Sequence, residues 1–404
     1  MHRRRLLQHL LSTTFLLPLA ARAHTDPARW SPFNARRLEA LIAQHGSRSA
    51  HYNAARRPYC VFDWDNTCIM NDCEEALFMY QASTLAYQLT AEEFGAVLRQ
   101  DVPRGPLRHG AQSVEAEAIA ADLEADYRWL LGARAAGTEW VHSAQFEDFR
   151  AKLLFMYEAI CETHPIEIGY TWIIRFYANM TPAQLQDMAL ASHRRGLGDS
   201  LRKVSYTSPA SLPGRAGIVE VGHFHGLRIN EEIRALMHAL RENGIDVYVS
   251  TASLDDVVRV FAGDPSFGYG VAPENVIGLR LDMRDGRYTS NYRQGWHFNW
   301  GPGKSAGIRT QLGARGEPLM VFGDSDGDAW MLRDFPSTRL GVIVNRLKGG
   351  EIGALCRTAA ETLGRADARF VLQGRDENTG LSLPQERTLP FGMRDARLLV
   401  TKSA

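Results

Sequence analysis

Aspartates and hydroxyl-bearing residues gather directly after three short apolar segments of the chain. They fall in the stretches Asp63-Trp64-Asp65-Asn66-Thr67, Thr251-Ala252-Ser253 and Gly323-Asp324-Ser325-Asp326-Gly327-Asp328. If these stretches meet, their carboxylates repel one another, and a divalent cation would relieve the repulsion. Oxygen ligands of this kind suit Mg²⁺. Lys304 adds a positive charge that suits an anionic substrate.

The apolar segments before these clusters have the length and composition of buried strands. They cover residues 59–62, 247–250 and 319–322, and a fourth such segment covers residues 340–344. Helical patterns separate the strands, including one that Asn230 can cap. This alternation predicts a parallel sheet covered on both faces, with a ligand site at the carboxyl ends of the strands.

A long insertion divides this α/β domain. The core is predicted to comprise residues 24–73 and 230–404, whereas residues 74–229 are mostly helical in pattern. The predicted architecture is a Rossmann-like parallel sheet with a helical domain inserted after the first cluster.

Local signals mark turns and helix ends. Thr90 and Thr181 begin capping boxes, and Asp285-Gly286 predicts a tight hairpin turn. Two segments rich in Gly, Pro and Ser are predicted to be loops, namely 101–113 and 196–217.

Residues 1–23 have the features of a signal peptide. Arg3-Arg4-Arg5 is positively charged, residues 6–19 are mostly apolar, and Ala21-Arg22-Ala23 fits a cleavage site. The general and the twin-arginine export routes are both open. Removal of this segment lowers the basic count from 46 to 42 against 46 acidic residues, so the exported protein is expected to be mildly acidic. In a Gram-negative bacterium it would be periplasmic.

The composition excludes several classes of protein. The 404 residues are 45% hydrophobic, and acidic and basic residues are equal in number, so the chain lacks the basic surface of a nucleic-acid binder. No apolar run reaches the ~18 residues of a permanent membrane span. Five cysteines are too few for a disulfide scaffold, and Cys68 and Cys73 are either buried thiols or a short-loop disulfide. The sequence does not determine the oligomeric state.

Together with Lys304, the three clusters resemble the motifs of the haloacid dehalogenase (HAD) superfamily, in its D-x-D-x-T phosphatase branch. The matching residues, in the family's order, are Asp63, Asp65 and Thr67 (first motif), Thr251 (second), Lys304 (third), and Asp324 and Asp328 (fourth). The resemblance covers roughly residues 58–73 and 230–350. It implies the HAD fold, and the insertion lies where the family places its first-type cap domain.

The resemblance implies a role for each aspartate. Asp63 is expected to attack phosphorus and form an aspartyl phosphate, and Asp65 to protonate the leaving group and then activate water. Mg²⁺ is expected to bind Asp63, the Asp65 backbone carbonyl and Asp324. Asp328 would be a further ligand or would orient the site from directly behind.

Thr251 and Lys304 are expected to hold the phosphoryl oxygens. Ser250 and Ser253 compete with Thr251 for the second motif. The T-A-S frame resembles the family's S-A-S version and favours Thr251.

Asp65 favours a phosphomonoester substrate, because the family's dehalogenases lack this second aspartate and its ion pumps carry Thr there and span membranes. The expected partner is therefore a small phosphomonoester. Phosphorylcholine is one candidate, and phosphoserine or a broad range of esters is the alternative. A non-enzymatic exported binding protein with the same fold is a second class, although the intact catalytic residues argue against it.

Glu75 is predicted to neutralise a cationic leaving group. It belongs to Asp72-Cys73-Glu74-Glu75, which resembles an acidic stretch of the exported phosphorylcholine phosphatases. Trp140, Trp172 or Trp296 could add a cation–π surface. The alternative is a solvated helix N-terminus whose acids complement the helix dipole. The tract from Trp296 to Trp300 departs from the family's usual spacing.

Three further patterns have simpler explanations. The stretch Gly301-Pro302-Gly303-Lys304-Ser305 is not a P-loop, because Phe298 replaces the first glycine. The cluster after Gly323 lacks the glycine and the final glutamate of a calcium loop. His223 and His225 could pair on a metal, but without a third ligand nearby a packed or solvated turn is favoured.

Overall fold

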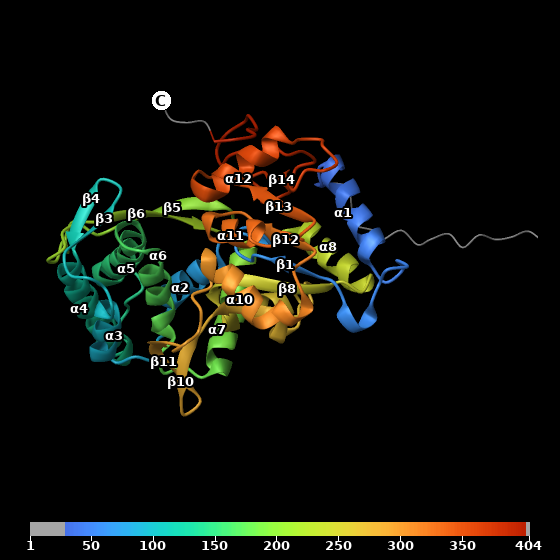
Figure 1. Cartoon of the computed structure of the whole chain (residues 1–404). Helices are drawn as coiled ribbons and strands as arrows, with labels where there is room; N and C mark the ends of the chain where they lie inside the picture. Colours follow the sequence, from blue (N-terminus) through green and yellow to red (C-terminus); the bar gives the residue numbers. More distant parts are fainter. Residues whose placement is uncertain (1–28, 401–404) are drawn as a thin grey trace, which may run out of the picture.

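The computed structural model describes residues 29–400, so the predicted signal peptide lies outside the described residues. Six parallel strands form the central sheet in the order β14-β13-β12-β1-β8-β9 (Figure 1). Their bounds are Tyr59–Phe62 (β1), Asp246–Leu254 (β8), Val276–Leu279 (β9), Met320–Gly323 (β12), Leu340–Asn345 (β13) and Phe370–Gly374 (β14). The prediction of a parallel sheet is confirmed.

Helices cover both faces of the sheet. Successive strand residues point to opposite faces, and here the residues on both faces are apolar, so both faces must be buried. In β1, Cys60 and Phe62 belong to one hydrophobic cluster, and Tyr59 and Val61 belong to another. The first face is covered by α1 (Pro32–His45), α8 (Glu231–Glu242) and α9 (Asp255–Gly263). The second is covered by α10 (Pro302–Leu312), α11 (Ala329–Arg333) and α12 (Gly350–Glu361). This is the predicted Rossmann-like core.

Strand β14 was not predicted, and β9 was predicted only as part of a hairpin strand over residues 277–281 rather than as a strand of this sheet. The apolar run of β9 continues into Leu281, where the separate strand β10 begins, so the sequence pattern merges two strands. The run of β14 is interrupted by Gln373, a buried polar residue whose Oε1 accepts from the N–H of Ser31 at 3.0 Å.

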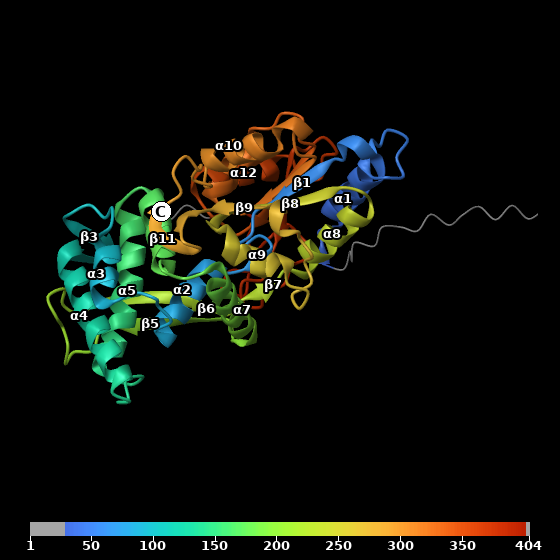
Figure 2. The same ribbon diagram turned by 90° about the horizontal axis from the view of Figure 1, so that it is seen from below.

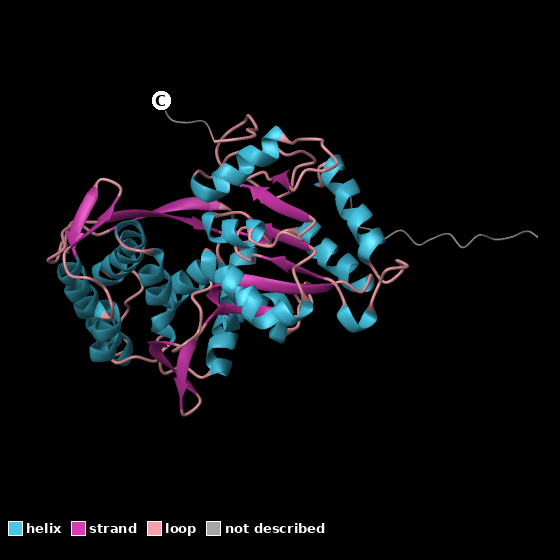
Figure 3. Cartoon of the chain, viewed as in Figure 1, coloured by secondary structure: helices cyan, strands magenta, loops and turns pink. Residues whose placement is uncertain are grey.

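The segment between β2 (Ile69–Met70) and β7 (Arg228–Ile229) is mostly helical (Figure 3), and we call it the cap. Its helices are α2 (Cys73–Thr84), α3 (Ala91–Arg99), α4 (Ala116–Ala135), α5 (Ala144–Thr163), α6 (Ile166–Ile174) and α7 (Pro182–Gly198). Both predicted capping boxes are present, because Thr90 and Thr181 exchange hydrogen bonds with Glu93 and Gln184.

The two predicted loops contain strands, so that prediction was wrong. β3 (Pro106–His109) pairs with β4 (Gln112–Glu115), and β5 (Arg202–Thr207) pairs with β6 (Glu220–His225) in a ribbon that reaches from the cap toward the core (Figure 1). These two-stranded ribbons are largely exposed and need no continuous apolar run. Their flanking Gly and Pro residues therefore dominate the sequence pattern.

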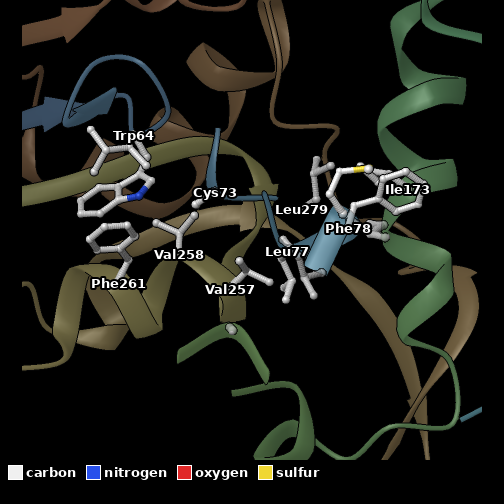
Figure 4. Packing of buried hydrophobic residues seen from close by; sticks show 14 of the residues in the cluster. Trp64, Cys73, Leu77, Phe78, Ile173, Val257, Val258, Phe261 and Leu279 are labelled. Carbon is white, nitrogen blue, oxygen red and sulfur yellow. The ribbon is translucent and has the colours of Figure 1, made fainter. Parts of the chain in front are cut away.

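The two ends of the cap segment lie side by side, because β2 and β7 pair antiparallel with Ile69 opposite Ile229. A shared hydrophobic core reinforces this connection: Figure 4 shows Leu77 and Phe78 of α2 close to Leu279 of the core and Ile173 of the cap. In addition, α7 packs against α9 (Figure 2). The cap is thus held to the core at several points.

The hairpin of β10 (Leu281–Arg284) and β11 (Arg287–Tyr292) is a further link. It turns at the predicted Asp285-Gly286, where both residues have positive φ angles of 51° and 73°. The backbone of Tyr288 exchanges hydrogen bonds of 2.9 Å with Asn179 and Met180 of the cap.

Within residues 29–400, no helix combines the length and the apolar character needed to cross a bilayer. The five cysteines all lie in this range and are unpaired, and Cys68 and Cys73 are buried thiols.

Candidate active site

Asp63 leaves the central strand β1 at the carboxyl edge of the sheet. Its N–H donates to the carbonyl of Phe322 in β12 at 2.9 Å, so the strand pairing fixes its backbone. Its Oδ1 lies 2.5 Å from Nζ of Lys304, and its Oδ2 lies 2.9 Å from Oγ1 of Thr67. Both oxygens of this buried carboxyl group are therefore held in place.

Asp324 and Asp328 come from the neighbouring strand end. Oδ2 of Asp328 accepts the N–H groups of Asp324 (2.9 Å) and Ser325 (3.0 Å), and its Oδ1 lies 2.6 Å from Nζ of Lys304. This loop requires glycine before Asp324, because a Cβ on Gly323 would lie 2.5 Å from the Cβ of Asp328. Asp328 thus orients both the loop and Lys304.

Oxygens of Asp63, Asp324 and Asp328 lie within 4.8 Å of one another, and all three residues are buried. Two cations face them: Lys304, and Arg346, whose Nη1 lies 2.8 Å from Oδ2 of Asp324. Three carboxylates against two cations leave a net negative charge. The donor set and the charge both fit Mg²⁺.

Burial and the neighbouring charges shift the pKa values of Asp63, Asp324 and Lys304. Burial, and then the charge of Asp328, raise the pKa of Asp63 well above its ordinary value, although Lys304 opposes the rise. Burial also disfavours ionised Asp324, but Arg346 and the hydrogen bonds to this carboxyl group, including that from Thr67, together lower the pKa of Asp324. Burial acts against charged Lys304, yet Asp328 and Asp63 raise its pKa. The nucleophile candidate therefore depends on its cationic neighbours for ionisation.

Asp65 points away from this trio. Its Oδ2 accepts from Oγ of Ser253 at 2.7 Å, and its Oδ1 accepts the N–H of Cys73, the first residue of α2, at 2.8 Å. Burial raises the pKa of Asp65 against these hydrogen bonds. A raised pKa is what a general acid needs in order to carry a proton near neutral pH.

Thr251 and Ser253 both lie in β8, but they differ in position. Ser253 lines the catalytic cleft, whereas Thr251 is fully buried and is not among the residues that line it. Oγ1 of Thr251 accepts the N–H of Ser253 at 3.1 Å, which leaves its hydroxyl proton free for another acceptor. The preference for Thr251 over Ser253 stays a prediction, and the structure gives Ser253 the direct contact with Asp65.

The cleft has a volume of about 640 Å³ and extends from these carboxylates to the cap. Four acids line its cap side, namely Asp72, Glu74, Glu75 and Glu158. Two of these acids and two tyrosines form what we call the acidic wall: Glu75, Glu158, Tyr157 and Tyr170. The hydroxyl of Tyr157 lies 3.4 Å from Oε1 of Glu75. Burial, and then the charges of Glu158 and Asp65, raise the pKa of Glu75 to about 8.

Known proteins share this architecture. The chain is 25% identical over 332 residues to a phosphorylcholine phosphatase of Pseudomonas aeruginosa, which is 76% of this chain and 78% of that protein. A crystal structure of a protein of unknown function from Anaerococcus prevotii DSM 20548 is 29% identical, with a TM-score of 0.82 over 89% of this chain and 97% of that one. The family model of the haloacid dehalogenase-like hydrolases matches residues 175–333, which include Thr251, Lys304 and Asp324.

The family match and the motif residues gathered at the edge of the sheet support a haloacid dehalogenase-like hydrolase. The family match does not reach Asp63 and Asp65, but the strand pairing of β1 with β8 and β12 brings both aspartates to the matched motifs. The hydrolase is a phosphoric monoester hydrolase.

The tryptophans proposed for the substrate site of the hydrolase do not line its cleft. Trp172 is fully buried and donates from Nε1 to the carbonyl of Leu98, and Trp296 lies under the guanidinium of Arg280. Trp140 packs on Phe146 of the cap. The aromatic residues that line the cleft are instead Trp300, Phe224 and the two tyrosines of the acidic wall, and the sequence did not single out the tyrosines.

The tract before Lys304 has a structural role in the hydrolase. Nδ2 of Asn299 donates to the carbonyls of Thr251 (2.7 Å) and Ile277 (3.1 Å), and so ties β8 to β9 below the site. Trp300 lines the cleft. His223 and His225 lie in β6, and among the described residues they join no group of three potential metal ligands.

Arg346 and Lys348 are cleft residues of the hydrolase that the sequence analysis missed. They follow β13, the fourth predicted strand, so the rule that functional residues follow strand ends would have found them. No local signal marks Tyr157 or Tyr170, because each lies on a helix that carries other aromatic residues, such as Phe155 on α5 and Trp172 on α6, which pack in the core instead.

Proposed function

We propose that this hydrolase is a magnesium-dependent phosphatase that forms an aspartyl phosphate and prefers phosphomonoesters with a cationic leaving group, phosphorylcholine being the first candidate. The observation that carries the proposal is the separation of charge within one cleft. Lys304 and Arg346 lie at the aspartate end, and Glu75 and Glu158 lie at the cap end. A zwitterionic phosphomonoester matches this polarity.

At the aspartate end, Asp63 would attack phosphorus as the bond to the leaving oxygen breaks, and the proton of Asp65 would pass to that oxygen. In the second step, water would attack phosphorus, Asp65 would accept its proton, and the bond to Asp63 would break. Nζ of Lys304, 2.5 Å from Asp63, is placed to stabilise the phosphoryl oxygens.

Asp63, Asp324 and Asp328 are the carboxylates that would hold Mg²⁺. Bound there, the ion would offset negative charge on the carboxylates and the phosphoryl group. Asp328 already accepts from Lys304 and three donors of the Asp324-Ser325 loop, so we expect it to act mainly from behind the other two.

At the cap end, the acidic wall supports a cationic leaving group. Glu75 and Glu158 are half-buried, and the charge of Glu158 raises the pKa of Glu75, so a nearby positive charge would stabilise the ionised form of Glu75. A quaternary ammonium donates no conventional hydrogen bond, so charge and the faces of Tyr157 and Tyr170 would provide recognition. The similarity to a phosphorylcholine phosphatase supports the same choice.

A substrate panel with Mg²⁺ tests the proposal. We expect kcat/KM to fall in the order phosphorylcholine, phosphorylethanolamine, glycerol phosphate, and the cationic esters to exceed glycerol phosphate by at least about tenfold, which corresponds to ~1.4 kcal/mol. Equal values for all esters would favour a broad-specificity phosphatase. A preference for phosphoserine would assign the cleft to an amino-acid phosphate instead.

Export is the second part of the proposal, and it rests on residues 1–23 alone. Expression of the full chain in a Gram-negative host, fractionation and N-terminal sequencing test it. A mature protein that begins after Ala23 in the periplasmic fraction is expected, and full-length cytosolic protein would contradict it.

A further inference from the structure

A second cavity of about 480 Å³ lies on the far side of one wall of the catalytic cleft. It is enclosed by α2, α7, the start of α5 and the β5–β6 ribbon. Four residues line both spaces: Asn71, Asp72, His223 and Phe224. The proposed reaction uses none of the residues that line this cavity alone.

Three arginines line the cavity, and two of them have no carboxylate partner in the described part of the chain. Arg202 pairs with Asp199. In contrast, Arg150 contacts only the rings of Phe146 (4.3 Å) and Tyr206 (5.4 Å), and its buried Nε has no hydrogen-bond partner. Arg195 contacts only the ring of Tyr80, at 5.8 Å.

The three guanidinium groups all lie close enough to Tyr206 and His225 to shift the pKa of each. Burial raises the pKa of Tyr206, and Arg150, Arg202 and Arg195 each oppose the rise. Burial lowers the pKa of His225, and the same three arginines lower it further while Asp199 opposes them. The positive charges therefore converge on one region of the cavity.

The opposing acids do not neutralise this region. Asp199 is committed to Arg202, and its other oxygen lies 3.7 Å from Nδ1 of His225. Asp72 is engaged as the N-cap of α2, where it accepts the N–H groups of Glu74 and Glu75. Glu147 is exposed at the rim. Two converging guanidinium groups without carboxylates are a recognised arrangement for binding phosphate.

We propose that this arginine-lined cavity is a second binding site, distinct from the catalytic cleft, for a small phosphate-bearing anion. Arg150 and Arg195 bind the phosphate oxygens, and the ring of Tyr206 holds the plane of Arg150. A cavity of this size accepts inorganic phosphate with its water or a small phosphorylated metabolite.

Isothermal titration calorimetry of the full chain with inorganic phosphate and Mg²⁺ tests the site without any use of activity. The double variant R150Q/R195Q is expected to bind one phosphate fewer than the wild type, or to bind it at least about tenfold more weakly. Since Arg195 is exposed, R195Q alone tests the site without a risk to folding and should also weaken it. R194Q, an exposed neighbour on α7, is the matched control and should leave both stoichiometry and affinity unchanged.

Location is tested separately by a crystal soaked with tungstate. Tungsten between Arg150 and Arg195 is expected, and its absence there while the catalytic cleft is occupied would overturn the proposal. Equal phosphate stoichiometry and affinity in the wild type and R150Q/R195Q would overturn it as well. Failure of the proposed catalytic function would change neither measurement.

Discussion

Nζ of Lys304 lies between two carboxylates, 2.5 Å from Oδ1 of Asp63 and 2.6 Å from Oδ1 of Asp328. Asp63 follows β1, Asp328 follows β12, and Lys304 lies in the first turn of α10, so three elements position one cation. Because Asp328 is held by backbone N–H groups, it fixes Lys304, and Lys304 in turn favours ionised Asp63.

Asp63→Asn is expected to abolish turnover while the fold is retained, because an amide cannot form the acyl phosphate. Asp65→Asn should slow turnover by ~10²–10⁴-fold, the usual contribution of a general acid–base group. Steady-state rates and a melting curve for each variant provide the measurement. Near wild-type activity of Asp63→Asn would overturn the assignment of the nucleophile.

Removal of divalent metal is expected to abolish activity, and Mg²⁺ should restore it better than Ca²⁺. The larger, looser coordination of Ca²⁺ would let it bind both oxygens of Asp63 and hinder attack. Asp324→Asn should raise the Mg²⁺ concentration needed for half-maximal activity by at least about tenfold. Full activity in excess chelator would exclude the metal site.

Glu75→Gln is expected to raise KM for phosphorylcholine by ~5- to 30-fold, equivalent to ~1–2 kcal/mol, and to change KM for glycerol phosphate little. Glu162→Gln is the control, because Glu162 lies on the same helix as Tyr157 but bonds His109 at the surface. An unchanged ratio of the two Michaelis constants would leave Glu75 as a helix-start acid.

The pH dependence of the same ratio is a separate test. Because the pKa of Glu75 is raised to about 8, this side chain is mostly protonated at pH 6 and ionises as the pH rises. KM for phosphorylcholine should therefore fall between about pH 6 and pH 8 relative to KM for glycerol phosphate. The relative KM should be flat with pH in Glu75→Gln.

Thr251→Ala and Ser253→Ala distinguish the two candidates for the second motif. If Thr251 binds the phosphoryl group, its loss should lower kcat/KM by ~10- to 100-fold without a shift of the pH profile. Ser253→Ala should instead move the limb of the pH–rate profile that reports Asp65, since Ser253 donates to that carboxylate at 2.7 Å. The reverse pattern would assign the motif to Ser253.

Asp126→Asn is expected to stabilise the protein at alkaline pH. Burial, and then Asp148, raise the pKa of Asp126 to about 8 in the folded cap, so ionisation of this group costs stability as the pH rises from about 4 toward 8. The variant should gain roughly 2–4 °C in Tm over the wild type at pH 8 and gain less at pH 5. Exposed Asp187, replaced by Asn, should show no such pH dependence.

Local patterns in the sequence were enough to predict the parallel core and the residue types at its carboxyl edge. Short apolar runs identified four strands, and the aspartates and Thr251 were recognised because they follow strand ends of a parallel sheet. Lys304 was recognised as a positive charge in the position of the family's third motif. The capping boxes at Thr90 and Thr181 could also be predicted from the sequence, since each involves residues only three positions apart.

The cap residues that line the cleft could be identified only from the folded structure. Tyr157 and Tyr170 approach Glu75 from separate helices, and Ser253 meets Asp65 across 188 positions of sequence. Such contacts depend on how helices pack, and helix packing leaves no local pattern in the residues that contribute to it. For the same reason the prediction that Trp140, Trp172 or Trp296 lines the substrate site was wrong. Large aromatic side chains suit a buried core, and Trp172 packs in the core rather than in the cleft.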